Sequence, residues 1–217
     1  MLTLYHEPIS PNSRRVWITL LEKKLEFELV EIKLDGEQFQ PDFMAISPFH
    51  HIPALVDDGF KMVESLAIMD YLEAKYPTPA MLPKDGKDLA VVRMVQLVTV
   101  NELFPATFPL IPKILGLPGG DQEKIEQAHQ KITTVLKFFE NLLGDRPYFG
   151  SQNLTLAEVV AGTVIPWLSQ GGVSLSDYPK LSAWCDRLMA REAWQATEAT
   201  PEVMEAFKSR MTAQMAR

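Results

Sequence analysis

The sequence predicts an α/β domain followed by an all-helical domain. Three observations predict this fold class. Residues 1 to about 75 mix strand-like and helix-like hydrophobic patterns, whereas apolar residues recur at helical spacing from residue 88 onward. The segment between them contains three prolines and one glycine, which do not continue a helix. We therefore expect a first domain over 1–76, a linker over 77–87 and a helical domain over 88–217.

The first domain should follow the order βαβ–α–ββα. Asn12 or Ser13 should cap its first helix, which should run to Lys24. The first βαβ unit implies a parallel strand pair with a right-handed crossover. Because the bond from Ile52 to Pro53 can be cis and enters the third strand, this order is typical of a thioredoxin-like domain. The expected elements are strands over 2–5, 27–34, 54–56 and just after 57–59, and helices over 13–24, 40–45 and 65–75.

The second domain should be built from helices alone. Its first helix is apolar nearly all round, and three prolines between 105 and 112 must kink or restart it. Asp121 should cap a long helix, and Thr155 with Glu158 has the spacing of a capping box. The expected helices cover 88 to about 103, 121 to about 143, the residues after 155, 177–189 and 201–217, with a loop at 116–120.

Composition excludes several classes of protein. A net charge of −7 argues against binding nucleic acid, which needs a basic surface. We expect no membrane-spanning run and no signal peptide, since the chain begins directly with a strand pattern. The single cysteine, Cys185, cannot form an internal disulfide and fits a cytoplasmic location. One cysteine and four scattered histidines give no spaced set of metal ligands, so no metal site is expected.

Residues 47–72 have the features of a site for a peptide-like anion. A cis proline at Pro53 would leave the backbone N–H and C=O of Ile52 free to pair with an extended ligand. Ser65 opens the following helix, where unpaired N–H groups and the helix dipole favour a carboxylate.

The same stretch resembles the glutathione-binding half of soluble glutathione S-transferases. The resemblance rests on Ser-Pro-Phe at 47–49, Ile-Pro-Ala-Leu at 52–55 and Glu-Ser-Leu-Ala-Ile at 64–68, and it extends over nearly the whole chain. It implies a cytoplasmic enzyme with a thioredoxin-like and an all-α domain, which conjugates its co-substrate glutathione to hydrophobic electrophiles in detoxification. Two alternatives remain: an interaction or stress module without transferase activity, and a glutathione-dependent isomerase or dehalogenase on the same scaffold.

Three hydroxyl groups are candidates for stabilising the glutathione thiolate. Aligned on Leu4-Tyr5 and on the Arg-Arg-Val at 14–16, Ser10 falls where the serine of theta-, delta- and phi-like transferases stands. Ser13 and Tyr5 are the alternatives, and a backbone amide or Arg14 is also possible. Ser10 could instead merely cap the helix, and the two roles are compatible. The first domain has no cysteine, which excludes the cysteine-dependent classes of the family.

The resemblance also implies positions that bind the rest of glutathione. The backbone of Ile52, held by Pro53, would pair with the cysteinyl part. Glu64 would take the γ-glutamyl ammonium and Ser65 its carboxylate. His51 and Gln38 would lie near the glycyl end, and His50 is expected to be a surface residue. The expected glutathione-binding residues are therefore Gln38, His51, Ile52, Pro53, Glu64 and Ser65.

The electrophile pocket should lie between the two domains. Its candidates are apolar, and each could equally belong to a core. The implied small-molecule partner is a small hydrophobic electrophile. A homodimer is also expected, because one self-complementary contact between subunits would bury the extra apolar side of the first helix in the second domain. The pocket candidates are Ile9, Phe104, Phe108, Ile111 and Trp167.

Overall fold

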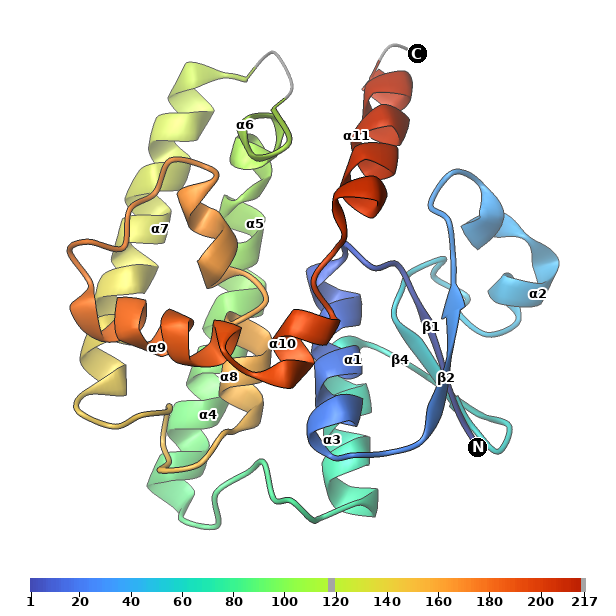
Figure 1. The fold of residues 1–217 in the computed structure, drawn as a ribbon, viewed down its shortest axis with the longest axis horizontal. Helices are drawn as coiled ribbons and strands as arrows, with labels where there is room; N and C mark the ends of the chain where they lie inside the picture. Colours follow the sequence, from blue (N-terminus) through green and yellow to red (C-terminus); the bar gives the residue numbers. More distant parts are fainter. Residues whose placement is uncertain (117–119, 216–217) are drawn as a thin grey trace. The chain divides into compact units, whose positions relative to one another are not determined.

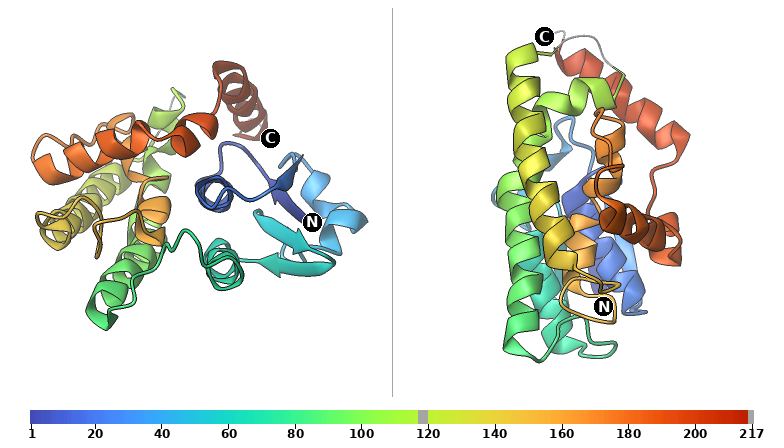
Figure 2. Two further views of the ribbon diagram at one scale, coloured as in Figure 1. Left: turned by 60° about the horizontal axis from the view of Figure 1, so that its bottom comes forward. Right: turned by 90° about the vertical axis from the view of Figure 1, so that its left-hand side faces the viewer.

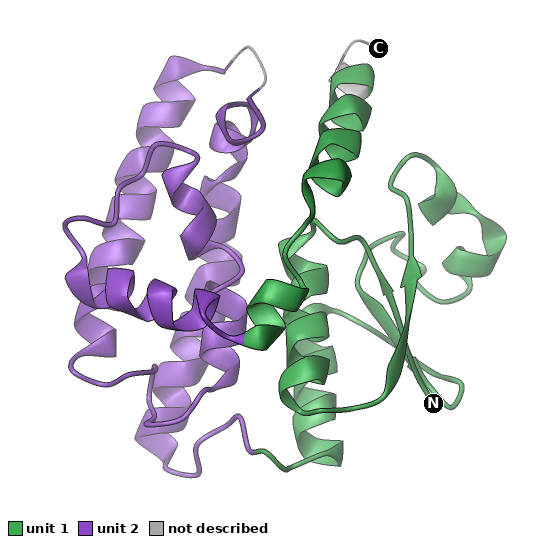
Figure 3. Cartoon of the chain, in the orientation of Figure 1, with its two compact units in different colours: residues 1–79, 192–217 green, residues 80–191 purple. Residues whose placement is uncertain are grey.

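The computed structural model describes residues 1–116 and 120–215 and divides into two compact units (Figure 3). Unit 1 contains Met1–Pro79 and the described residues from Glu192 onward, whereas unit 2 contains Ala80–Arg191. The C-terminal segment therefore groups with the first domain by its contacts, which the pattern of the sequence did not predict. The functional boundaries at 76 and 88 stay predictions.

A four-stranded mixed sheet forms the centre of unit 1, in the order β2-β1-β3-β4. As predicted, β1 is parallel to β2; it is antiparallel to β3, which pairs in turn with β4. Leu4 is fully buried in the middle of β1, opposite Leu29 on one side and Leu55 on the other. The strands are β1 (Leu2–His6), β2 (Phe27–Glu31), β3 (Ala54–Asp57) and β4 (Phe60–Val63).

Helices cover both faces of this sheet (Figures 1 and 2). Helices α1 (Pro11–Glu22) and α3 (Ser65–Lys75) pack together on one face. The other face carries η1 (Glu37–Phe39) and α2 (Pro41–Met44), with Phe43 buried against it. The core under α1 and α3 contains Leu2, Leu4, Val16, Leu20, Leu55, Ile68 and Leu72. This arrangement confirms the predicted βαβ–α–ββα order.

Of the two predictions for the cap of α1, the cap at Asn12 or Ser13 was wrong, whereas the alternative of a cap by Ser10 is confirmed. Ser10, not Asn12 or Ser13, is the N-cap: its backbone is extended and its side chain accepts a hydrogen bond from the Ser13 N–H. Pro11 explains the shift, because a proline at the first helical position lacks only an N–H that would be unpaired there.

In the part of unit 2 that the structure describes, helices are the only regular elements, and Tyr148 and Ser151 form one isolated bridge. The predicted interruption by prolines is present: the first helix passes through a π-helical turn before a series of short helical segments. Residues 117–119 of the expected loop lie outside the described residues. The elements are α4 (Gly86–Val98), the π-helical turn η2 (Thr99–Leu103), α5 (Phe104–Ala106), η3 (Phe108–Leu110), α6 (Ile111–Ile114), α7 (Gln122–Leu143), α8 (Leu156–Ala161), η4 (Ile165–Ser169) and α9 (Pro179–Met189).

Two predicted caps are present in unit 2. Asp121 caps α7, and Thr155 with Glu158 forms a capping box at the start of α8. Glu158 is completely buried and also accepts hydrogen bonds from the Phe149 N–H (2.7 Å) and the Trp184 indole N–H (3.4 Å). It therefore links the start of α8 to α9 and to the segment before α8.

One continuous helical stretch, Gly86–Ala106, is long and apolar enough to cross a membrane by length and composition. The expectation that no such run exists was therefore wrong by this criterion. Val92, Val95 and Leu103 from this stretch are fully buried, and α4 packs against α8. Met94 and Leu97 are exposed apolar residues on the same helix.

The chain returns to unit 1 after α9. Helices α10 (Glu192–Ala196) and α11 (Pro201–Met215) follow, and α10 packs against α1. Thr197 accepts a hydrogen bond from the Arg14 guanidinium at 3.4 Å. The prediction of a last helix from residue 201 is confirmed over its described part, whereas α10 was not predicted.

Candidate active site at one end of the sheet

The register of the sheet brings the predicted glutathione-binding segments to one end. Tyr5 at the end of β1 pairs with Ala54 at the start of β3, and Ala54 pairs with Val63 at the end of β4. The loop after β1, the Ile52-Pro53 segment before β3 and the start of α3 after β4 therefore meet at this end. The segment after β2, which contains Gln38, begins at the same end because β2 is parallel to β1.

Ser10 has a hydroxyl proton available for a ligand. It is half-buried at the start of α1, and its oxygen accepts the Ser13 N–H at 3.4 Å. A hydroxyl that accepts a hydrogen bond can still donate its own proton. The positive end of the helix dipole adds to the favourable environment for an anion there.

The two alternative hydroxyls are in less suitable surroundings. Ser13 is fully buried, and its oxygen accepts the Glu7 N–H at 3.3 Å. Tyr5 packs against Phe43 with ring centroids 6.0 Å apart, on the face of the sheet that carries α2. These contacts favour structural roles for both residues.

The Ile52-Pro53 bond is cis, as the thioredoxin-like pattern predicts. Among the described residues, the backbone N–H and C=O of Ile52 make no hydrogen bond with the rest of the chain. Ser47, which sequence reasoning missed, fixes the preceding loop: its hydroxyl donates to the His51 carbonyl (2.8 Å) and accepts the His51 N–H (3.3 Å). The arrangement leaves Ile52 available for pairing with an extended ligand.

Glu64 and Ser65 lie at the junction of β4 and α3. Glu64 has a positive φ of 68°, which is uncommon outside glycine, and its side chain is exposed. Ser65 is the first residue of α3 and is 7% exposed. No side-chain cap occupies the N-terminal N–H groups of α3. This helix start can therefore accept a carboxylate.

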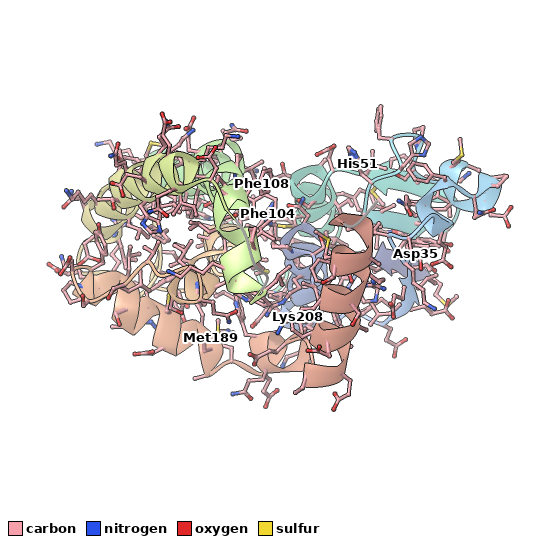
Figure 4. The ribbon with its side chains drawn as sticks, turned by 90° about the horizontal axis from the view of Figure 1, so that it is seen from above. Asp35, His51, Phe104, Phe108, Met189 and Lys208 are labelled. Carbon is pink, nitrogen blue, oxygen red and sulfur yellow. The ribbon has the colours of Figure 1, made fainter. Side chains whose placement is uncertain are left out.

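Two candidates for the glycyl end have different surroundings. His51 is exposed (Figure 4), whereas Gln38 is half-buried and its side-chain oxygen accepts the Gly36 N–H at 3.0 Å. His50, expected at the surface, is half-buried instead, because its ring packs against Phe39 at 5.1 Å between centroids.

The electrophile-pocket candidates are distributed over both units. Ile9 is 9% exposed in unit 1, next to Ser10. Phe104 and Phe108 lie together on unit 2 in an edge-to-face contact of 5.2 Å (Figure 4), and Phe108 is exposed. Ile111 and Trp167 are both half-buried in unit 2. A pocket formed by all five stays a prediction.

Charge near the site is distributed unevenly. Arg14 and Arg15 on α1 are buried; burial lowers the pKa of both, that of Arg15 to about 10. Burial lowers the pKa of His6 to about 4, so its ring is neutral near pH 7.

The single cysteine does not have the properties of a nucleophile. Cys185 is buried in unit 2, and burial raises the pKa of its thiol to about 12, which argues against a nucleophilic role.

Sequence reasoning also missed Glu7. This residue follows β1 and is 1% exposed, and its carboxylate accepts the N–H groups of Ile9 (2.8 Å) and Ser10 (3.0 Å). Burial raises the pKa of Glu7, and these hydrogen bonds oppose that shift. The only signal in the sequence is an acidic residue in a short loop before a helix.

Within the described residues, no group of three or more His, Cys, Asp or Glu side chains could hold a metal ion.

Comparison with known proteins gives the same family over both halves of the chain. Models of the glutathione S-transferase N-terminal and C-terminal domains match residues 4–80 and 98–192. The chain is 32% identical to glutathione S-transferase F10 of Arabidopsis thaliana, covering 92% of this chain and 97% of the relative. It is 31% identical to maleylacetoacetate isomerase of Mus musculus, covering 89% and 90%.

A solved structure adds a ligand to this comparison. A glutathione transferase homologue from Sulfitobacter, solved with bound glutathione, superposes with a TM-score of 0.76 at 27% identity. The similarity covers 90% of this chain and 96% of that one.

Proposed function

Because this chain belongs to the glutathione S-transferase family, it is a glutathione S-transferase with glutathione as its co-substrate, and we propose that Ser10 stabilises the reacting thiolate. The observation that supports this role most directly is the geometry of Ser10. Its hydroxyl lies at the start of α1, accepts the Ser13 N–H and keeps its own proton for an anion.

The energies involved are sufficient for this role. A thiol of pKa ~8.5 is only slightly ionised near pH 7. Lowering that pKa by ~2 units needs ~2.7 kcal/mol of differential stabilisation. A hydrogen bond from a hydroxyl to an anion contributes about 1.5–3 kcal/mol. The N-terminus of a helix contributes roughly 0.3–1 kcal/mol more.

The remaining contacts would orient glutathione along the end of the sheet. The free backbone groups of Ile52, held by Pro53, would pair with the cysteinyl part as an added strand. Ser65 and the start of α3 would bind the γ-glutamyl carboxylate, and Glu64 the ammonium. His51 and Gln38 would bind the glycyl end.

The thiolate would then attack an electrophilic carbon next to apolar side chains. Ile9 directly precedes Ser10 in the loop before α1. Phe104 and Phe108 form an apolar pair in unit 2. With Ile111 and Trp167, these side chains suit a small hydrophobic electrophile such as an activated aryl chloride. Thiolate formation and proximity of the two reactants would supply most of the rate gain.

The kinetics of hydroxyl variants test this proposal. Ser10→Ala should lower kcat/KM with an activated aryl chloride by about tenfold or more, because one hydrogen bond to the thiolate is lost. Ser13→Ala and Tyr5→Phe serve as matched controls and should keep most of the activity. Full activity in Ser10→Ala, together with loss in either control, would assign the role to the other hydroxyl.

A glutathione-dependent isomerase is a second candidate, favoured by the similarity to maleylacetoacetate isomerase. Product analysis with aryl halides, isothiocyanates and a cis-unsaturated diketo acid would separate the two functions. A transferase releases glutathione conjugates, whereas an isomerase returns free glutathione and the trans acid.

We further propose a cytoplasmic homodimer that binds neither nucleic acid nor a membrane. Met94 and Leu97 on α4 are 40% and 51% exposed, so this helix has an apolar side that its own unit does not cover. A self-complementary contact between two subunits is one way to bury such a side.

A further inference from the structure

Glu7 connects the loop that carries Ser10 to the C-terminal helix. One carboxylate oxygen, Oε2, accepts the N–H groups of Ile9 (2.8 Å) and Ser10 (3.0 Å). The other, Oε1, accepts a hydrogen bond from Arg210 on α11 at 3.0 Å. Glu7 and Arg210 are 203 positions apart in the sequence and lie in the same unit.

We propose that Glu7, held by Arg210, is a positioning residue that fixes the Ser10 hydroxyl for thiolate stabilisation. This inference rests on the proposed role of Ser10. Neither Glu7 nor Arg210 needs to touch glutathione: the carboxylate sets the backbone of the loop, and the guanidinium sets the carboxylate.

The contacts around Glu7 define the loop tightly. The Glu7 backbone N–H bonds to Ser13 Oγ, and the Glu7 carbonyl accepts the Ser10 N–H at 3.1 Å. The Ser10 N–H is thus shared between the carbonyl and the carboxylate of one residue. Together these bonds close the loop on itself directly before the first turn of α1.

A carboxylate suits this place better than an amide. Glutamate accepts hydrogen bonds at both oxygens, so it can serve the loop and Arg210 together. Glutamine has one oxygen and one NH₂ group. If its oxygen served the loop, its NH₂ would point at the guanidinium, and the reverse orientation would direct NH₂ at two N–H donors.

The charged groups that face Glu7 come from three elements. Arg210 on α11 favours the ionised carboxylate, whereas Glu31 at the end of β2 disfavours it. The adjacent His6 is neutral near pH 7 because burial lowers its pKa to about 4. Burial is the largest influence on Glu7 and raises its pKa. Among these three groups, only the positive charge of Arg210 opposes protonation of the carboxylate.

This balance predicts a pH effect. Without Arg210, the pKa of Glu7 should rise further, and the carboxylate should take up a proton at a higher pH. A protonated carboxyl accepts hydrogen bonds less well, so the loop should loosen on the acidic side. The acid limb of the kcat/KM profile should therefore move to higher pH in an Arg210 variant.

A double-mutant cycle tests the inference, with Glu7→Gln, Arg210→Met and the combined variant assayed for kcat and KM. Each single variant should lower kcat about tenfold with a smaller change in KM for glutathione, because a bond to a charged group is lost and neither residue belongs to the proposed γ-glutamyl anchor. The combined variant should be no worse than the more impaired single variant.

The controls separate positioning from a general loss of structure. Arg210→Lys should restore part of kcat and return the acid limb towards that of the unaltered enzyme. Lys208→Met removes a cation from the same helix (Figure 4) but not a contact of Glu7. This variant should keep the kcat and the acid limb of the unaltered enzyme. If Glu7→Gln does not fold, the kcat values and pH profiles of Arg210→Met and Arg210→Lys still test the inference.

Two results would have different meanings. If Arg210→Met and Lys208→Met both match the unaltered enzyme in kcat and in pH profile, the inference about Glu7 and Arg210 is wrong. If Ser10→Ala keeps full activity while the Arg210 variant loses it, the proposed role of Ser10 is wrong. The loop would then position another group, such as a backbone N–H.

Discussion

At the scale of single residues, Ser10 combines a structural role and a proposed chemical role in one hydroxyl group. Its oxygen caps α1 by accepting the Ser13 N–H, and its proton remains for the thiolate. The sequence predicted Ser10 as the thiolate-stabilising residue and gave it as one candidate for the cap, but the helix was expected to begin after a cap at Asn12 or Ser13, two or three residues later. Pro11 accounts for the difference, since it suits the first helical position and fixes the cap one residue before it.

The residues that support the site could not be predicted from sequence patterns. Ser47 and Glu7 act on backbone groups of their own loops, and such contacts depend on how the loop folds. Ile52, Glu64 and Ser65 became candidates because a motif surrounds them, and their binding roles stay predictions. A short polar loop offers no periodicity from which the direction of a side chain can be inferred.

The γ-glutamyl anchor gives a prediction for a single residue. Ser65→Ala should raise KM for glutathione several-fold and leave kcat nearly unchanged, because the proposed pose places Ser65 on a part of the substrate that changes little in the transition state. Ser209→Ala, an exposed serine on α11, is the control. An unchanged KM in Ser65→Ala, measured by steady-state kinetics, would contradict the proposed binding pose.

At the scale of elements, most helices and strands could be predicted because their signals are local. Hydrophobic periodicity indicated the strands, and Asp121 and Thr155 marked two helix starts. The π-helical turn Thr99–Leu103 and the short helix α10 could not be predicted. The turn lies directly before α5, which contains Pro105, and hydrophobic periodicity does not separate a π-helical turn from an α-helical one. A five-residue helix is too short to show a period.

The capping box of α8 gives a prediction for an element. Glu158 accepts four hydrogen bonds, from Phe149, Trp184 and both the N–H and hydroxyl of Thr155. Glu158→Gln should destabilise the protein by about 1–3 kcal/mol, because its NH₂ group must face buried donors. Chemical denaturation of this variant and of Glu205→Gln, an exposed control, would measure the difference.

The same residue should make stability depend on pH. Burial raises the pKa of Glu158 from 4.5 to about 7, so the folded state holds a proton that the unfolded state releases. Stability from this group is therefore full below pH 4.5 and is lost as the pH rises through about 7. The stability gap between the unaltered protein and Glu158→Gln should narrow over this range. A gap that widens with pH would contradict the assignment.

At the scale of the whole molecule, the course of the C-terminal segment was the main feature that the sequence could not predict. The contact between Glu7 and Arg210 joins residues 203 positions apart, and no local pattern encodes such a pairing. The division into an α/β part and a helical part was predictable, since composition and periodicity change along the chain. The assignment of α10 and α11 to unit 1 required the structure.

The exposed apolar side of α4 gives a prediction for the whole molecule. Light scattering should show a particle of about twice the 24.5 kDa subunit mass. Leu97→Glu should shift it towards the monomer, because a charge would be placed in an apolar contact. Phe138→Glu on α7, also at an exposed apolar position, should leave the mass unchanged. A monomer of the unaltered protein at micromolar concentration would contradict the homodimer.

The pKa of the bound glutathione thiol tests the central claim most directly. Ultraviolet absorbance of the thiolate, titrated on the enzyme saturated with glutathione, should give a pKa well below the ~8.5 of a free thiol. In Ser10→Ala, also saturated with glutathione, the pKa should rise by about one unit or more, since one hydrogen bond to the thiolate is lost. An equal thiol pKa in the two proteins would contradict the role of Ser10.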